Sequence, residues 1–101
     1  MDPGGGTNSG AETGGIVTVR YWAAARAAAG VTHDDLEVPG PLSLADVRRE
    51  VLSRHPDARF ESVLRVCSVL VGDRPVGSSD PAAVAVRPGE TVEFLPPFAG
   101  G

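Results

Sequence analysis

The segment ETVEFLPPFAGG, residues 90–101, joins a predicted strand to a pair of glycines at the end of the sequence. Residues 90–95 combine β-branched and aromatic side chains, which is typical of a strand. Pro96 and Pro97 stiffen the chain after it, so the residues that follow should project instead of folding back. Gly100 and Gly101 carry no side chains and would let the backbone enter a narrow channel. The segment therefore predicts a strand that ends in a projecting tail.

Gly101 is a candidate reactive group because its carboxylate is the last group of the sequence. A free α-carboxylate has a pKa of about 3.3–3.7, so it is ionised at neutral pH and can attack the α-phosphate of a nucleotide. The product would be an acyl-adenylate. Two terminal glycines can also arise by chance, since 13 of the 101 residues are glycine, and chain ends fray.

Upstream of this segment, the spacing of the apolar residues switches between the alternation of a strand and the 3.6-residue period of a helix. The order of these switches predicts the fold. Residues 16–22 alternate, with Val17, Val19 and Tyr21 on one face, as in a half-buried strand. A second extended stretch surrounds residues 36–38, and a further strand covers 66–71 before a tight turn at Gly72-Asp73. Two strands, a helix and two or three more strands predict an α+β domain, with one main helix across one face of a mixed sheet.

The main helix follows Ser43, whose hydroxyl can cap it, with Asp46 three residues later in a variant of the capping box. Proline disfavours helical geometry in the residue before it, so the helix should end near His55-Pro56. Its apolar stripe has the spacing i, i+3, i+7 and i+8 and consists of Leu44, Val47, Val51 and Leu52.

The first fifteen residues contain six glycines and no large apolar residue after Met1. Such a segment cannot bury enough surface to offset its ordering entropy, so residues 1–15 should be a disordered extension of one domain at 16–101. The extension lacks the basic start and apolar stretch of a secretion signal, and no apolar run is long enough to span a membrane. One cysteine, Cys67, cannot form an internal disulfide, which favours the cytoplasm.

The charge pattern argues against nucleic-acid binding and informs the class of protein. The net charge is −4, and the arginines are scattered or share a helix with acidic residues. All nine basic residues are arginine. A chain without lysine cannot be linked to copies of itself through ε-amines, which favours a carrier over a chain-building modifier. Codon bias explains the missing lysine equally simply.

No side-chain set in the sequence predicts catalysis or metal binding by this chain. Cys67 is in phase with Val69 and Val71 of an apolar strand and is expected to be a small core residue. His55 is expected at a helix end favoured by the dipole, and His33 in a loop. Neither histidine has a second ligand at metal-site spacing, and no triad is evident.

Two motifs resemble one known family. The ending FLPPFAGG, residues 94–101, resembles the MoaD-type small subunit of molybdopterin synthase, within the ubiquitin-like sulfur-carrier (MoaD/ThiS) group. The stretch VRYWAAARAAAG, residues 19–30, is similar to that family's first strand and its Ala, Arg and Gly pattern. The resemblance implies a β-grasp, or ubiquitin-like, fold. Ala27 departs from the acidic residue often found there, which puts an acid-dependent contact of that loop in doubt.

The resemblance also implies a mechanism for the tail. A ubiquitin-activating-like adenylyltransferase would use ATP to adenylylate Gly101, and a sulfur donor, a rhodanese or a cysteine desulfurase, would convert it to a thiocarboxylate. Ala99 and Gly100 would be threaded into the large synthase subunit, which would make the dithiolene of molybdopterin. The chain would bind no cofactor and would be a non-catalytic sulfur-donor subunit of the synthase complex.

The surface beside the tail is expected to bind these partners. Strand phase places Trp22 and two leucines away from the helix, where they would form an exposed apolar patch with the tail residues. Alternatively, the N-terminal segment or a loop covers the patch, or Trp22 turns into the core. The predicted partner-binding residues are Trp22, Arg26, Leu70, Leu95, Pro96, Pro97 and Phe98.

Two other functional classes share parts of this pattern. Sulfur carriers for thiamine or cysteine synthesis also end in Gly-Gly, but a double proline before it is less typical of them. A ubiquitin-like modifier of lysines, or a β-grasp adaptor that binds without chemistry, is the third class.

Overall fold

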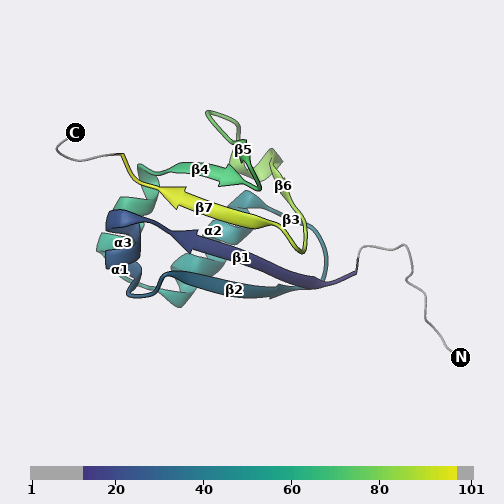
Figure 1. Cartoon of the computed structure of the whole chain (residues 1–101), viewed down its shortest axis with the longest axis horizontal. Helices are drawn as coiled ribbons and strands as arrows, with labels where there is room; N and C mark the ends of the chain where they lie inside the picture. Colours follow the sequence, from purple (N-terminus) through teal and green to yellow (C-terminus); the bar gives the residue numbers. More distant parts are fainter. Residues whose placement is uncertain (1–12, 98–101) are drawn as a thin grey trace, which may run out of the picture.

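The computed structural model describes residues 13–97 of the chain. Two segments lie outside the described part, residues 1–12 and the four residues Phe98, Ala99, Gly100 and Gly101. They contain most of the predicted extension and of the predicted tail. The described residues form a five-stranded sheet in the order β2-β1-β7-β4-β5 (Figure 1). Its strands are β1 (Gly15–Tyr21), β2 (His33–Val38), β4 (Ser68–Val71), β5 (Arg74–Pro75) and β7 (Thr91–Leu95).

The sheet is mixed, as the sequence predicts. β1 pairs antiparallel with β2 and parallel with β7, and β4 pairs antiparallel with both β7 and β5. A second, two-stranded sheet joins β3 (Leu42–Ser43) to β6 (Ala85–Val86). β1 begins at Gly15, one residue before the predicted domain boundary. The parallel pair at the centre brings the beginning and the end of the domain side by side.

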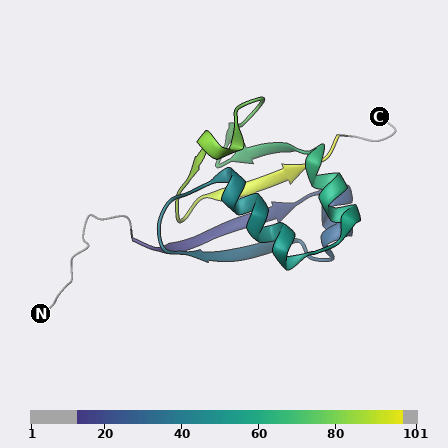
Figure 2. The same ribbon diagram turned by 180° about the vertical axis from the view of Figure 1, so that it is seen from behind.

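The main helix, α2 (Leu44–Arg54), crosses one face of the five-stranded sheet (Figure 2). The predicted cap is confirmed: the Asp46 backbone N–H donates to the Ser43 hydroxyl at 3.0 Å, and the Ser43 N–H donates to the Asp46 carboxylate at 3.3 Å. The helix ends at its cap residue His55, next to Pro56. Three of the four predicted stripe residues are buried and the fourth, Leu52, is partly buried. One main helix on a mixed sheet is thus confirmed.

Two short helices were not predicted. α1 (Ala23–Ala29) follows β1 directly, and α3 (Ala58–Arg65) packs against it. α1 has seven residues, six of them alanine and the other Arg26, so it lacks a stripe of large apolar side chains. α3 carries buried Phe60 and Leu64 at the i, i+4 spacing, and Asp57 caps it by accepting from the Arg59 N–H at 2.8 Å. That cap and spacing were a usable signal. A 3-10 turn, η2 (Pro81–Ala83), precedes β6.

Two local assignments from the sequence were wrong. His33 is the first residue of β2 instead of a loop residue, because β2 pairs along β1 as far as Arg20. Cys67 lies before β4 instead of inside a strand, because its N–H donates to the Leu64 carbonyl at the end of α3 at 3.2 Å. The core lies between the sheet and the helices, and the opposite face of the sheet has no helix over it (Figures 1 and 2).

Candidate functional site

An apolar hollow lies at the end of the sheet where β7 leads toward the C-terminal segment. β1 and β7 are parallel, with Tyr21 opposite Phe94, so Trp22 and Leu95 emerge beside each other. β4 is antiparallel to β7, so its first residue, Ser68, lies opposite Leu95. The hollow has a volume of about 510 Å³, and its lining consists of Trp22, Ala23, Ser68, Leu70, Leu95, Pro96 and Pro97. We call these seven residues the docking hollow.

The structure brings together five of the predicted partner-binding residues. Trp22, Leu70, Leu95, Pro96 and Pro97 all line the docking hollow. Trp22 is 39% exposed and its ring lines the hollow, so the alternative that the ring turns into the core is wrong. Whether these residues bind a partner remains a prediction.

Arg26, the sixth described residue of the predicted set, lies apart from the docking hollow. It is on α1 with its side chain exposed. Within residues 13–97 that side chain forms no hydrogen bond or ion pair. The structure therefore leaves Arg26 available at the surface but does not join it to the hollow.

Polar contacts hold the Trp22 ring at the edge of the hollow. Its indole Nε1 donates a hydrogen bond to Glu93 Oε1 at 2.9 Å. The guanidinium carbon of Arg20 lies 5.3 Å from the ring centre, which is within cation–π range. Neither Arg20 nor Glu93 was singled out from the sequence. The contact joins residues 71 positions apart, and only the pairing of β1 with β7 reveals it.

Backbone strain marks the same place. Ala23 follows Trp22 and has φ of 49°, in the left-handed region that side chains disfavour. It is the one non-glycine residue with positive φ among residues 13–97. The strained residue lies at the junction where β1 turns into α1, and both Trp22 and Ala23 line the docking hollow. Strain of this kind tends to persist at functional positions.

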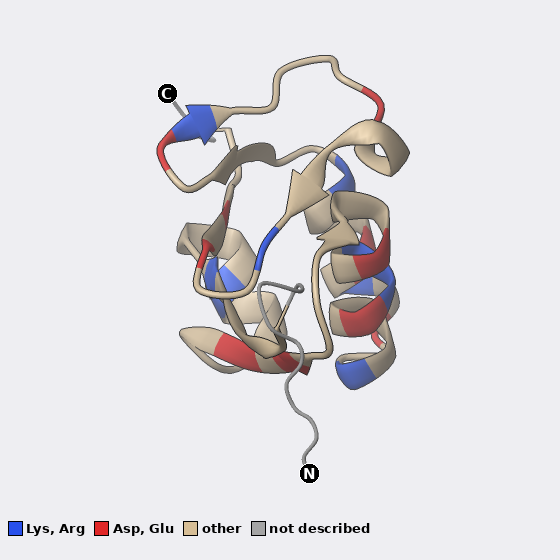
Figure 3. Cartoon of the chain, turned by 90° about the vertical axis from the view of Figure 1, so that its right-hand side faces the viewer, with Lys and Arg blue, Asp and Glu red and all other residues tan. Residues whose placement is uncertain are grey.

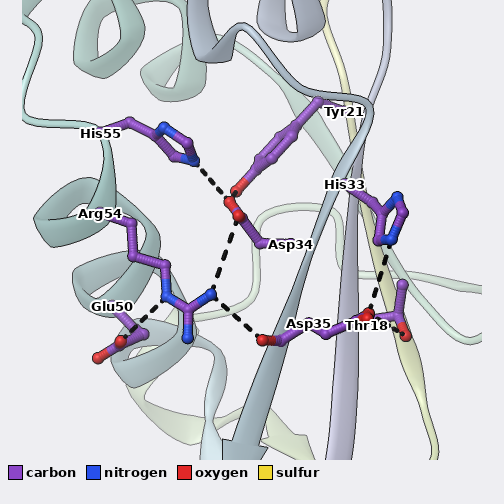
Figure 4. Close-up of polar contacts among 8 residues, drawn as sticks. All are labelled: Thr18, Tyr21, His33, Asp34, Asp35, Glu50, Arg54 and His55. Carbon is purple, nitrogen blue, oxygen red and sulfur yellow. Dashed lines mark hydrogen bonds and ion pairs between the residues drawn. The ribbon is translucent and has the colours of Figure 1, made fainter.

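A separate group of polar side chains, the Asp34 cluster, ties β1, β2 and the end of α2 together (Figure 4). Asp34 Oδ2 accepts a hydrogen bond from the Tyr21 hydroxyl at 2.6 Å and lies 2.6 Å from His55 Nε2. Arg54 Nη1 lies 3.9 Å from Asp34 Oδ1 and donates to the Asp35 carbonyl at 3.2 Å. The cluster fixes the strand end from which Trp22 emerges.

The contacts shift two pKa values in the Asp34 cluster. Burial alone would raise the pKa of Asp34, but hydrogen bonds from Tyr21 and His55 and the nearby Arg54 charge outweigh it and hold that pKa below its usual range. Burial, reinforced by Asp34, raises the pKa of the Tyr21 phenol. The cluster therefore keeps a carboxylate ionised and a phenol neutral, which suits a structural tie. The one residue that could have indicated this cluster from the sequence is Tyr21, because a buried tyrosine hydroxyl needs a hydrogen-bond partner.

Cys67 has the surroundings of a packing residue. Its thiol donates to the Val63 carbonyl at 3.3 Å, and burial raises its pKa to about 11. The reactive thiolate is therefore scarce at neutral pH. In the described part of the chain, no three His, Cys, Asp or Glu side chains come together as a metal site would require. No helix of that part is long and apolar enough to cross a membrane.

Charges on α2 are mixed (Figure 3). Arg49 pairs with Asp46 at 2.7 Å, and Arg54 pairs with Glu50 at 3.3 Å. Because two of the three arginines of α2 are paired with an acidic residue of the same helix, α2 offers no continuous basic surface of the kind that binds nucleic acid.

Comparisons with known proteins agree on one family. The ThiS family matches residues 19–101. A relative from Aspergillus niger named molybdopterin synthase sulfur carrier subunit is 31% identical over 83 residues, which cover 82% of this chain and 91% of that protein.

Two solved structures share the fold. SAMP1 from Haloferax volcanii, a small archaeal modifier protein, superposes with a TM-score of 0.71 at 20% identity, covering 86% of this chain and all of that one. One chain of a complex of subunits 1 and 2 of the molybdopterin-converting factor from Helicobacter pylori superposes with a TM-score of 0.58 at 20% identity. The match covers 85% of this chain and 99% of that one. These likenesses confirm the predicted β-grasp fold.

Proposed function

The chain belongs to the ThiS/MoaD family of sulfur carriers, and from this premise we propose that it is the small, sulfur-carrying subunit of a molybdopterin synthase. The observation that carries the proposal is the docking hollow at the root of the C-terminal segment. An exposed apolar surface of this kind on a small domain usually marks a protein interface. The Aspergillus relative that matches most of this chain bears the name of that subunit, and the Helicobacter relative is in a complex with a second subunit.

The proposed chemistry begins with the Gly101 carboxylate. A carboxylate is a poor acyl donor, so an adenylyltransferase transfers AMP from ATP to it and releases pyrophosphate. A persulfide of the sulfur donor, a rhodanese or a cysteine desulfurase, then displaces AMP from the carbonyl. A second thiol then attacks the donor cysteine sulfur of the resulting acyl disulfide, which forms a disulfide between the two thiols and releases the C-terminal thiocarboxylate. ATP is bound by the activating partner, and this chain supplies the reacting group.

Each part of the chain has a role in this scheme. Gly100 and Gly101 lack side chains, so a narrow channel of a partner can admit them together with Ala99. Pro96 and Pro97 form one side of the docking hollow, so docking of the hollow positions the start of the tail. Sulfur then passes from the thiocarboxylate to the pterin precursor inside the large subunit, in the cytoplasm. The tail and the docking surface are this chain's contribution.

The intact mass of the protein from cells that make molybdenum cofactor tests the proposal. A thiocarboxylate replaces one oxygen by sulfur, which adds about 16 Da, the same nominal mass as oxidation of Met1 or Cys67. Fragmentation of the C-terminal peptide separates these cases. A Cys67→Ala variant serves as a control, because it should still be alkylated at the thiocarboxylate.

Two results would contradict the proposal. One is extra mass found only on Met1 or Cys67 while molybdenum cofactor is being made. The other is co-purification with a thiazole or cysteine synthase, or a ladder of heavier conjugates, in place of the large synthase subunit. These would support the thiamine, cysteine or modifier alternatives.

A further inference from the structure

The Trp22 ring contacts two charged side chains that come from neighbouring strands, Arg20 of β1 and Glu93 of β7. β1 and β7 pair in register with Arg20 opposite Glu93. Residues two apart on a strand lie on the same face, so Arg20 and Trp22 both lie on the face of the sheet that no helix covers. The register therefore places an arginine, an indole and a carboxylate together beside the docking hollow.

Glu93 fixes the indole before any partner arrives. Its Oε1 accepts from Trp22 Nε1 at 2.9 Å, while the Arg20 guanidinium lies over the ring. An exposed tryptophan would otherwise lose rotamer freedom on binding, and ordering it in advance removes that cost. Trp22 is thus a pre-ordered anchor instead of a loosely exposed side chain.

Arg20 keeps an unpaired positive charge at this anchor. Glu93, the residue opposite Arg20 on β7, accepts from the indole through Oε1, and Arg20 forms no ion pair within residues 13–97. The chain as a whole carries a net charge of −4. A partner with an acidic rim would therefore be repelled by the chain as a whole and attracted at Arg20, which fixes how it docks.

Resting on the proposed function, we infer that Arg20, Trp22 and Glu93 act together to select the large synthase subunit. The Trp22 ring enters an apolar socket on that subunit, and Arg20 pairs with a carboxylate on the rim of the socket. Glu93 is a positioning residue that holds the ring in the orientation the socket requires. The recognition chemistry is thus an apolar socket with an acidic rim.

Binding of the purified large subunit from the same organism to the whole chain tests the pairing of Arg20. An exposed ion pair accounts for roughly a two- to fivefold change in affinity, so Arg20→Gln should weaken binding by that factor. Arg20→Glu should weaken it more, about tenfold, because like charges then meet. The wild-type affinity should fall as salt is added, and the Arg20→Glu variant should lose this dependence.

Arg87→Glu is the matched control, because it makes the same charge change on an exposed residue before β7, at the end of that strand away from Leu95. It should leave the affinity within about twofold, since screening removes the effect of distant charges. Equal weakening by Arg87→Glu and Arg20→Glu would show a general charge effect and overturn the inference. Unchanged or tighter binding of Arg20→Glu would overturn it as well.

The role of Glu93 is tested on the sole tryptophan of the chain. Its single indole N–H signal in a nitrogen-15 spectrum should move in Glu93→Ala and stay near its place in Glu93→Gln, whose amide oxygen still accepts. Affinity should follow the same order. In a double-mutant cycle, Glu93→Ala should lose its effect once Trp22→Phe has removed the N–H; additive losses would refute the positioning role.

The outcome is separate from that of the proposed function. A chain that carries the thiocarboxylate and binds the large subunit equally well with or without the Arg20→Glu change overturns this inference and leaves the proposed function intact. A chain that binds the large subunit with the expected charge dependence but never carries sulfur supports the inference and contradicts the proposed function.

Discussion

Replacement of Asp34 by alanine should be among the most destabilising single changes of a polar residue in this domain. Asp34 Oδ2 serves both the Tyr21 hydroxyl and His55 Nε2 at 2.6 Å. The Tyr21 residue is 2% exposed, so water cannot easily replace the lost acceptor. The His55 side chain is 17% exposed and can turn toward solvent.

The magnitude follows from these exposures. An unsatisfied buried hydroxyl costs about 1–3 kcal/mol, and a lost hydrogen bond to a group that reaches water costs about 0.5–1.5 kcal/mol. The Asp34→Ala change should therefore lower the free energy of unfolding by about 2–4 kcal/mol. A domain of this size loses about 4–8 °C of melting temperature per kcal/mol, so a drop of roughly 10–25 °C is expected.

Urea unfolding and calorimetry of Asp34→Ala, Asp34→Asn, Tyr21→Phe and the double variant Tyr21→Phe/Asp34→Ala measure the effect. Asp34→Asn retains an oxygen acceptor but loses the charge, so it should cost about half as much as Asp34→Ala. Tyr21→Phe removes the hydroxyl together with its hydrogen bond, so it leaves no unsatisfied buried donor and should cost only about 1 kcal/mol. The double variant should be no less stable than Asp34→Ala alone. A loss below about 1 kcal/mol for Asp34→Ala would refute the reasoning, because the hydroxyl would then have found another partner.

The pH dependence supplies a second check. The folded pKa of Asp34 is lowered, so its stabilisation is present above the unfolded pKa of about 3.9 and is lost as the pH falls through the folded value. The gap between wild type and Asp34→Ala should therefore narrow in acid. The folded pKa of Tyr21 is raised, so wild type should lose stability above about pH 10, where the unfolded phenol ionises. Tyr21→Phe should lack this alkaline loss.

Three further predictions concern the site. Trp22→Ala should weaken partner binding by about 1–4 kcal/mol in a titration, with a much smaller loss of stability; an equally large drop in melting temperature would place the ring in the core. Deleting Gly101, or adding one residue after it, should abolish ATP consumption by the activating enzyme and leave the fold intact by circular dichroism; an extended chain that still consumed ATP would defeat the mechanism. Ala23→Gly should relieve the strain of the positive φ and raise the free energy of unfolding by about 0.5 kcal/mol. As a control measured in the same urea unfolding experiment, Ala27→Gly in the same helix should lower it by about 0.5–1 kcal/mol. Equal losses for the two variants would mean that Ala23 is unstrained.

Local signals in the sequence were enough for β1, β7 and the main helix, whereas the bounds of β2 and β4 were partly wrong and the short strands β3 and β6 were not predicted. Alternation at Val17, Val19 and Tyr21 matches the buried face of β1, and the Ser43–Asp46 box starts α2 where expected. These features depend on neighbours within a few residues, so they can be read without the fold. α1 was missed because it is short and its first residue adopts a conformation that no propensity favours.

The docking hollow was predictable in part. Strand phase alone indicated that Trp22, Leu70 and Leu95 point away from the helix, and the structure places them together. The phase could not indicate that Glu93 would bond the indole, because that contact depends on how β1 and β7 align. His55 was correctly expected at a helix end, but its contact with Asp34 was not foreseen.

The sequence by itself determined the α+β class, the capped helix, the alternating strands and the family resemblance, because each rests on a local pattern or a motif. Only the tertiary structure decided which side chains meet. The parallel register of β1 with β7 joins Trp22 to Glu93, 71 residues apart, and the packing of α2 brings His55 to Asp34, 21 residues apart. Such contacts depend on strand register and helix placement, which the burial of the whole core selects and no short segment encodes.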